Sequence, residues 1–252
     1  MLADLLRDCK VALAFLTRAP LRAQHQWSDA DLAASMPWFP LVGALIGLVG
    51  AIAYALAVWL GLPPLPAAAI ALGAGIWLSG ALHEDGLADV ADGFGGGSTR
   101  EDKLAIMRDP RIGSYGALAL ALALLARAGA IMALAEPSAV AAALVAAGAA
   151  SRAALPVVMI ALPRARTDGL AASAGRPHPL RAAAAVLIAV LMALVLLGHA
   201  ALAALLAGAL GTLAIALLAR RQIGGGTGDV LGAVQQLTEI GLLLGLLAAR
   251  AP

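Results

Sequence analysis

The chain has 252 residues, of which 62% are hydrophobic and 13% are charged, and its formal net charge is +2. Soluble domains are roughly 45–50% apolar and about 25% charged, so this composition excludes an ordinary soluble domain and predicts an integral membrane protein that lies in a lipid bilayer. The single cysteine, Cys9, excludes an internal disulfide and a thiolate metal cluster. The small positive charge comes from loop residues and gives no reason to expect a nucleic-acid partner.

The first residues predict a retained amphipathic helix. Asp4 and Asp8 lie beside Arg7 and Lys10, and no cleavage site of small residues follows, which is not the pattern of a signal peptide. Apolar stretches near the roughly 20 residues that a transmembrane helix needs come next. They cover 37–60, 64–82, 114–135, 138–162, 182–198, 200–219 and 230–250. The predicted fold class is therefore all-α, a polytopic membrane bundle of about seven transmembrane helices that forms one domain over residues 1–252.

The basic residues predict the orientation of this bundle. Nearly all Lys and Arg side chains fall in segments on one side of the predicted spans, and such segments usually face the cytoplasm. The turns on the other side are short. The segments 83–113, 163–181 and 220–229 are therefore expected in the cytoplasm, and the active site is expected to face that side of the membrane.

An unusually acidic segment follows the second predicted span. Seven of the 15 acidic residues lie between positions 83 and 111. On a helix, Asp85, Asp89 and Asp92 share one face, where like charges about 5–6 Å apart repel one another. A solvated loop whose carboxylates face water is the alternative, but carboxylates gathered at a membrane exit favour a function. Asp85, Asp89 and Asp92 are the predicted catalytic residues, on a hard divalent cation, most simply Mg²⁺.

Three neighbours of this stripe complete the prediction. Glu84 and Asp109 are expected to be further metal ligands. His83 is predicted to be catalytic, as a general base or a substrate hydrogen-bond partner, although a lone histidine at a helix end is equally often structural.

The segment after the acidic stripe predicts a short helix and an anion site. Ser98 with Glu101 predicts a capping box that begins a helix over 99–108. Arg108 and Arg111 can clamp a phosphate, or they can extend to the membrane surface after Pro110 has ended that helix. Ser114, three residues after Arg111, is assigned to the same substrate site.

A glycine run opens the last predicted span. Gly225 and Gly226 precede Thr227 and Asp229, and converging backbone amides at a helix start can bind a phosphate. These four residues are predicted to bind substrate. The alternative is that Thr227 or Asp229 simply caps the helix. The run is not a Walker A loop, because no Lys-Ser or Lys-Thr pair follows it.

Three charged residues lie inside predicted spans at similar depth. A buried ion pair of Glu239 with Arg152, or failing that with Arg127, relieves the cost of at least about 2.5 kcal/mol for each isolated charge. No other acidic residue is expected inside a span. The competing interpretation is a polar cavity for a large substrate, in which Arg152 binds substrate. Gly43xxxGly47 and Gly241xxxGly245 predict close helix packing.

Four motifs follow one another along the chain. They are LAFLTRAP at 13–20, HEDGLADVADG at 83–93, IMRDPRIGSYG at 106–116 and GGTGDVLGA at 225–233. In this order they resemble the cobalamin synthase family, the adenosylcobinamide-GDP ribazoletransferases, with Pro110 as a minor departure. The resemblance implies a bacterial inner-membrane enzyme that requires Mg²⁺. It would join the corrinoid nucleotide adenosylcobinamide-GDP to α-ribazole or its 5′-phosphate and release GMP, late in vitamin B12 assembly.

The residues fit that chemistry, because phosphoryl transfer needs positioning and charge neutralisation. Mg²⁺ on the carboxylates of 83–93 would bind the diphosphate, Arg108 and Arg111 would stabilise the departing GMP, and a carboxylate or His83 would orient or deprotonate the ribose hydroxyl. Other classes remain open. A CDP-alcohol phosphotransferase shares the start of its signature with Asp89-x-x-Asp92-Gly93, a prenyl transferase also uses aspartate-bound Mg²⁺, and a cation- or proton-coupled transporter uses intramembrane acids. A homo-oligomer is also left open.

Overall fold

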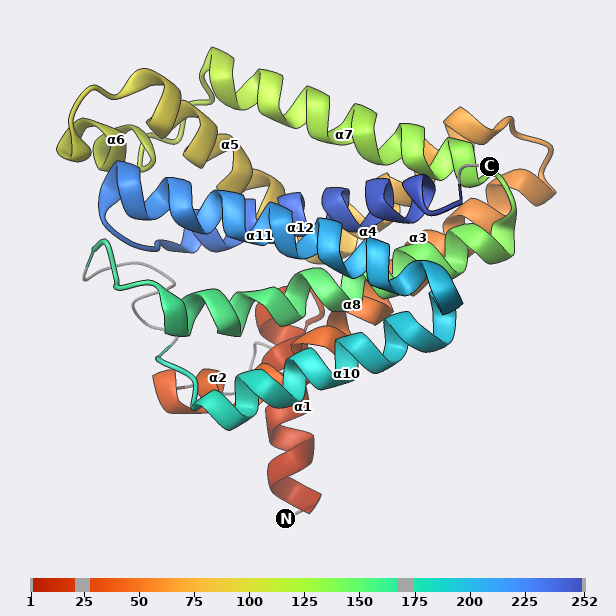
Figure 1. The fold of residues 1–252 in the computed structure, drawn as a ribbon, viewed down its shortest axis with the longest axis horizontal. Coiled ribbons are helices and arrows are strands. Elements are labelled where there is room, and N and C mark those ends of the chain that lie inside the picture. Colours follow the sequence, from red (N-terminus) through yellow and green to blue (C-terminus); the bar gives the residue numbers. More distant parts are fainter. Residues whose placement is uncertain (1, 21–27, 167–174, 251–252) are drawn as a thin grey trace.

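The computed structural model describes residues 2–20, 28–166 and 175–250, and it shows a bundle of long helices (Figure 1). The part of the predicted 163–181 segment that covers 167–174 lies outside the described residues. The predicted all-α class is confirmed, because the described residues form helices and only an isolated two-residue bridge between Arg164 and Gly226. The elements are α1 (Leu2–Leu16), α2 (Asp29–Ser35), η2 (Met36–Trp38), α3 (Phe39–Trp59), α4 (Pro64–Ser79), α5 (Leu82–Gly96), α6 (Arg100–Ile106), α7 (Ser114–Leu134), α8 (Pro137–Ala161), α10 (Pro179–Leu197), η3 (Gly198–Ala200), α11 (Ala201–Ile223) and α12 (Gly228–Ala248).

Each of the seven predicted spans coincides with one long helix, namely α3, α4, α7, α8, α10, α11 or α12. By length and apolarity, five described segments can cross a membrane, or six if α4 and α5 together form one bent span. That count takes residues 179–223 as one segment of 45 residues, although α10 and α11 run in opposite directions on either side of η3 in Figure 1. A multi-pass helix bundle is therefore confirmed, and the count of seven stays a prediction.

Glycines set the closest helix contacts, as the two Gly-xxx-Gly spacings predicted. A Cβ added at Gly43 would collide with the backbone of Gly148, so α3 and α8 approach each other at the distance of bare backbones. A Cβ added at Gly241 or Gly245 would lie 2.5 or 2.7 Å from a carbonyl oxygen of α11. Small residues allow such packing in a bilayer, where lipid tails are as apolar as leucine and close van der Waals contact drives association.

A sharp bend separates α4 from α5. Gly80 and Ala81 both have positive φ, at 71° and 58°, and the two helix axes differ by 93°. The 16 residues of α4 rise about 24 Å, which is less than the ~30 Å hydrocarbon core. The acidic helix α5 begins at this bend, and its first turn packs into the bundle, where His83 is buried. The position of this segment relative to the membrane exit stays a prediction.

The short helix α6 begins one residue later than predicted. Thr99, and not Ser98, caps it, and the reciprocal partner is Asp102, and not Glu101. Both pairs fit the spacing of a capping box, so the sequence pattern alone does not separate them.

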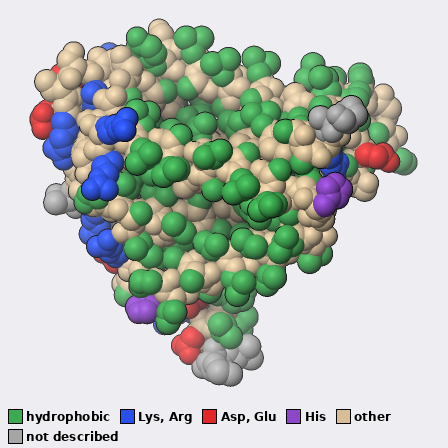
Figure 2. Space-filling view, viewed as in Figure 1, with side chains coloured by type: hydrophobic (Ala, Val, Ile, Leu, Met, Phe, Trp, Pro, Cys, Tyr) green, Lys and Arg blue, Asp and Glu red, His purple; other side chains and the backbone are tan. Residues whose placement is uncertain are grey.

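The surface divides into an apolar band and a basic end. Leu118, Leu122 and Leu125 on the outer face of α7 are 62–66% exposed, as expected of side chains that contact lipid. Figure 2 shows this apolar surface over the middle of the molecule. Lys and Arg side chains cluster along the left edge, at the end where α6 lies in Figure 1. The basic end is the face formed by the segments that the sequence assigned to one side of the membrane.

Candidate active site

The three segments that the sequence predicted on one side of the membrane meet at the basic end. The side chain of Arg100, at the start of α6, donates from Nε to the carbonyl oxygen of Ile223 (2.9 Å) and from Nη2 to that of Ala165 (2.6 Å). Lys103 also contacts the side chain of Gln222. Arg100 therefore ties α6 to the end of α11 and to the chain that follows α8, a role that no motif of the sequence indicated.

The acidic stripe of α5 faces the start of α12. Asp85 is exposed and Asp89 is half-buried, and the charges of Asp85, Asp92 and Asp229 all act on Asp89. Gly86 allows this approach, because a Cβ there would lie 2.7 Å from the carbonyl oxygen of Asp229. Carboxylates from two helices thus gather at one place, where their like charges repel one another.

Asp229 is the one member of this group with an arginine partner among the described residues. Its Oδ2 accepts hydrogen bonds from Nη2 of Arg166 (2.6 Å) and from the hydroxyl of Thr227 (3.2 Å). The other terminal nitrogen of Arg166, Nη1, is buried without a hydrogen-bond partner in the described part of the chain. Sequence reasoning missed Arg166, because it lies in a loop with no motif around it.

The glycine run makes a backbone contact. The amide of Gly226 donates to the carbonyl oxygen of Pro163 (2.8 Å), and that of Ala165 donates to Gly226 (3.0 Å). A Cβ on Gly225 would collide with Pro163, so a larger residue would push these two chain segments apart. Thr227 caps α12 by accepting from the amide of Val230 (3.2 Å). The glycine run therefore has a structural role, since it packs against Pro163 and Thr227 caps α12. Phosphate binding by Gly225, Gly226 and Thr227 stays a prediction.

Asp92 joins two of the sequence motifs. Its two carboxylate oxygens accept hydrogen bonds from the amides of Gly113 and Gly116, each at 2.8 Å. These amides belong to the start of α7, where the helix leaves donors without an internal partner. Asp92 therefore holds α7 against α5, and each of its oxygens keeps a second lone pair, so its metal role stays a prediction.

Asp109 and Arg111 pair with each other at the mouth of an open pocket. Arg111 donates from Nε (2.9 Å) and Nη2 (2.6 Å) to Asp109. These side-chain hydrogen bonds, and then one from the Arg111 amide, lower the pKa of Asp109 to about 2. The open pocket here, of about 500 Å³, is lined by Asp92, Asp109, Arg111 and Ser114, and Arg108 lies exposed beside it. The structure thus brings four predicted site residues together.

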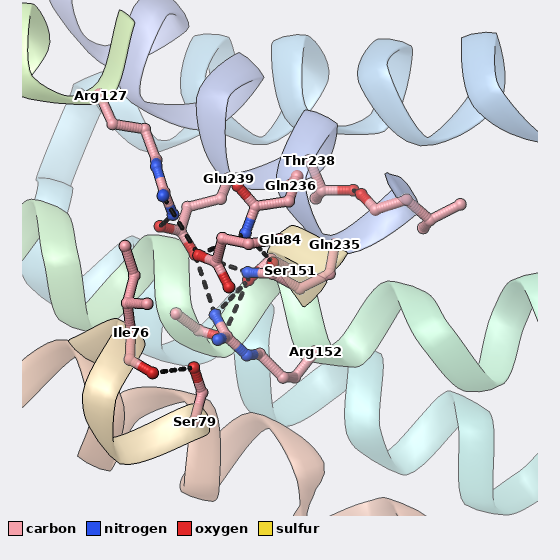
Figure 3. Close-up of polar contacts among 12 residues, drawn as sticks. Ile76, Ser79, Glu84, Arg127, Ser151, Arg152, Gln235, Gln236, Thr238 and Glu239 are labelled. Atoms are coloured by element: carbon pink, nitrogen blue, oxygen red, sulfur yellow. Dashed lines mark hydrogen bonds and ion pairs between the residues drawn. The ribbon is translucent and has the colours of Figure 1, made fainter. Parts of the chain in front are cut away.

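Charged side chains in the middle of the bundle form a separate network (Figure 3). Glu239 pairs with Arg152 (2.9 Å) and with Arg127 (3.3 Å), so the predicted buried pair is confirmed and includes both arginines. Arg127 also pairs with Glu84 (3.2 Å). The bend before α5 carries Glu84 into this network, and whether Glu239 is the only acidic residue inside a span stays a prediction.

Amides and a hydroxyl complete this network. Gln235 donates to Glu239 (2.6 Å) and to the hydroxyl of Ser151 (3.0 Å), and Gln236 donates to Glu84 (3.0 Å). The four charged side chains balance to zero and are only 4–12% exposed. The structure places Glu84, a predicted metal ligand, and Arg152, a predicted substrate residue, in this network and away from the basic end.

His83 lies in an apolar environment. It is buried, its Nδ1 has no hydrogen-bond partner among the described residues, and it borders a cavity of about 40 Å³ with Phe39, Leu155 and Leu231. No carboxylate lines that cavity, which favours the structural interpretation of this histidine. Its catalytic role stays a prediction.

The carboxylates of the basic end fit Mg²⁺ in one particular mode. Within residues 2–20, 28–166 and 175–250, no group of three or more His, Cys, Asp or Glu side chains is placed to hold a metal ion. Proteins usually hold Mg²⁺ by one or two carboxylates, with substrate phosphates and water as the other ligands. Asp85 and Asp89 lie one turn apart on α5. Unlike Glu84 and Asp109, they form no ion pair with an arginine among the described residues, so they fit that mode.

Comparisons with known proteins agree with the resemblance seen in the motifs. The family described as Cobalamin-5-phosphate synthase matches residues 8–247. Adenosylcobinamide-GDP ribazoletransferase of Mesorhizobium japonicum is 48% identical over 241 residues, which are 96% of this chain and 93% of that protein. The enzymes of the same name from Bradyrhizobium diazoefficiens and Azorhizobium caulinodans are 46% and 45% identical, over 96% and 98% of this chain and 93% and 98% of their own lengths. No solved structure matches the chain. The chain belongs to the cobalamin-5-phosphate synthase family.

Proposed function

We propose that this protein catalyses a late step of cobalamin biosynthesis, the transfer that its relatives' names describe. Adenosylcobinamide-GDP would be joined to α-ribazole or its 5′-phosphate, and GMP would leave. The observation that carries the proposal is the group formed by Asp85, Asp89, Asp229 and Arg166 at the basic end. It combines carboxylates that repel one another with a buried guanidinium nitrogen that has no protein partner among the described residues, which are the groups that a metal-bound diphosphate requires.

In this reaction a ribose hydroxyl attacks the phosphorus that is bound to the corrinoid. The bond between that phosphorus and the oxygen of GMP breaks, and GMP carries away the bonding electron pair. Mg²⁺ on Asp85 and Asp89 would supply charge neutralisation on the diphosphate. Nη1 of Arg166 donates to a phosphate oxygen. Arg111, which lines the open pocket, and Arg108, which precedes Asp109 in the chain, stabilise the charge that develops on GMP.

The proton of the attacking hydroxyl goes to Asp229. Its Oδ2 is already occupied by Arg166 and Thr227, so Oδ1 is the oxygen that we assign to the incoming hydroxyl. We assign His83 no role in the transfer, because no described carboxylate or other charged side chain lines the cavity beside it.

The basic end faces the cytoplasm in this proposal, and the protein lies in the inner membrane of a bacterium. The gathering of Lys and Arg at one end of an otherwise apolar surface supports this orientation (Figure 2). Nucleotides such as GDP derivatives are cytoplasmic, so a site at this end receives its substrate directly.

The test is the reaction itself. Purified protein is incubated with adenosylcobinamide-GDP, α-ribazole and Mg²⁺, and GMP is measured by chromatography. We expect GMP in proportion to the joined corrinoid product, and loss of both on chelation with restoration by added Mg²⁺. No GMP above that of heat-inactivated protein would overturn the function, and unchanged rates after chelation would overturn the metal.

A further inference from the structure

A second pocket lies beside the carboxylates and has no role in the steps above. It has a volume of about 350 Å³ and lies between the end of α8, the chain after it and the start of α12. Its walls are apolar, with Val158, Met159 and Leu162 on one side and Leu231 on the other. Binding sites for small molecules occupy roughly 300–1,000 Å³ and are mostly apolar with a few polar groups, so this pocket is of ligand size and type.

The polar groups of this pocket are cationic. Arg164 and Arg176 line it and are exposed at its rim, and Arg176 is held across it by a hydrogen bond to the carbonyl oxygen of Ile160. No carboxylate and no side-chain amide belongs to the described lining. An anionic group at the rim therefore meets two positive charges and no negative one.

The pocket also opens next to the proposed reaction centre. Thr227 is one of its lining residues, and the hydroxyl of Thr227 donates to Oδ2 of Asp229 (3.2 Å). A ligand in the pocket that extends past Thr227 reaches the carboxylate to which the attacking hydroxyl gives its proton.

We infer that this pocket binds the acceptor nucleoside, with its apolar base between Met159 and Leu231 and its 5′-phosphate between Arg164 and Arg176. The inference rests on the proposed function and selects the phosphorylated acceptor as the preferred one. The dimethylated benzimidazole of α-ribazole has methyl groups and few hydrogen-bonding atoms, so an apolar wall suits it. Guanine carries donors and acceptors on its edges, and these would lie unpaired against the same wall.

The experiment measures acceptor binding alone. The full-length protein is placed in nanodiscs of phosphatidylcholine, and calorimetry follows binding of α-ribazole and of α-ribazole 5′-phosphate without donor or Mg²⁺. We expect the phosphorylated form to bind more tightly. Arg164→Ala and Arg176→Ala should each weaken its binding about tenfold, the effect of one charge-assisted hydrogen bond, and leave unphosphorylated α-ribazole unchanged. Arg221→Ala, an exposed arginine of the same basic end outside the pocket, is the matched control and should change neither affinity.

A second variant tests the apolar wall. Met159→Trp fills the pocket and should abolish binding of both acceptors, while its thermal midpoint stays near that of the wild type. Protection gives a measurement that does not depend on repacking. In a Cys9→Ser background, Arg164→Cys should react with a maleimide, and α-ribazole should slow that reaction.

Three results would overturn the inference. One is wild-type acceptor binding by Met159→Trp with no protection at position 164. Another is displacement of α-ribazole 5′-phosphate by GMP in proportion to occupancy, which would assign the pocket to the donor. The third is loss of binding in nanodiscs of phosphatidylglycerol, which would make it a lipid-headgroup site. Because no turnover is measured, acceptor binding without GMP release would leave the pocket standing and remove the proposed function.

Discussion

The molecule has two groups of charged side chains, and they differ in balance. In the middle of the bundle, Glu84 and Glu239 are matched by Arg127 and Arg152, all nearly buried and joined by amides. At the basic end, Asp85 and Asp89 form no ion pair with an arginine among the described contacts, and Arg166, whose charge also acts on Asp89, pairs with Asp229. The balanced group has equal numbers of opposite charges, although Oε2 of Glu84 and Nε of both arginines have no hydrogen-bond partner among the described residues, whereas the group at the basic end keeps an excess of negative charge within the described part of the chain.

This contrast separates a network of matched charges from the proposed reaction site. A buried pair that satisfies itself holds helices in register, and losing one partner leaves an uncompensated charge. A group of like charges lowers the stability of the protein and persists because a function requires it. The same substitution, carboxylate to amide, should therefore act on stability in one region and on turnover in the other.

The largest effect is expected at the unbalanced group. Asp85→Asn and Asp89→Asn should each lower the rate of GMP release by at least about 100-fold, because each removes a ligand that neutralises the diphosphate. Thermal stability should stay the same or rise, since one repelling charge is gone. Glu101→Gln, with an exposed carboxylate at the same end of the molecule, is the control. Rates within threefold of wild type for both aspartate variants would contradict the metal site.

The balanced group should respond in stability. Glu239→Gln should cost about 3–5 kcal/mol of unfolding free energy, because Arg152 keeps its charge without its partner. The double variant with Arg152→Met should regain part of this loss, while Arg127 keeps Glu84. Thermal unfolding in detergent measures both, with the exposed Glu136→Gln as control. Losses in the double variant equal to the sum of the two single losses would show that the pair is not a unit.

Substitution of Asp92 should have moderate effects on both thermal stability and turnover. Asp92→Ala removes the acceptor for two amides at the start of α7 and should cost about 1 kcal/mol, as the loss of a helix cap does. Asp92→Asn keeps one acceptor oxygen and should retain more stability than Asp92→Ala. If Asp92 is also a metal ligand, the two variants should have equally low turnover. A ranking of turnover that follows stability would leave Asp92 with a positioning role.

The smallest effect is expected at Asp109. Its pKa is lowered to about 2 by hydrogen bonds from Arg111, so any stability from this pair is present above the ordinary carboxyl pKa of about 3.9 and is lost only as pH falls towards 2. The difference in thermal midpoint between wild type and Asp109→Asn should therefore be constant from pH 5 to 8. A difference that changes across that range would contradict the pairing.

The sequence predicted the long helices well because each needs about 20 apolar residues, and that requirement is visible in composition. The observed α8, Pro137–Ala161, is within one residue of its predicted range at each end. The bend after Ser79 was not predictable in the same way. Alanine favours helices and seldom adopts positive φ, so nothing at Ala81 indicated that the apolar stretch breaks there.

The candidate site was likewise only partly predictable from the sequence. Helical phase placed Asp85 and Asp89 together, because offsets of four residues share a face. The roles of Arg100 and Arg166 could not be predicted, because each contacts a segment far away in the sequence, and tertiary packing sets the distance between the two segments. Charged residues inside predicted spans allowed the pairing of Glu239 with its arginines to be predicted. The contribution of Glu84 was not predicted, because it depends on the bend before α5.

The bend between α4 and α5 also makes the reaction centre sensitive to the membrane itself. Because α4 rises about 24 Å against a hydrocarbon core of ~30 Å, an α4 that starts at the far headgroup layer would leave the start of α5 within the hydrocarbon. A bilayer of longer acyl chains deepens that position, and one of shorter chains raises it towards water. If the proposed transfer takes place here, turnover should therefore depend on acyl-chain length.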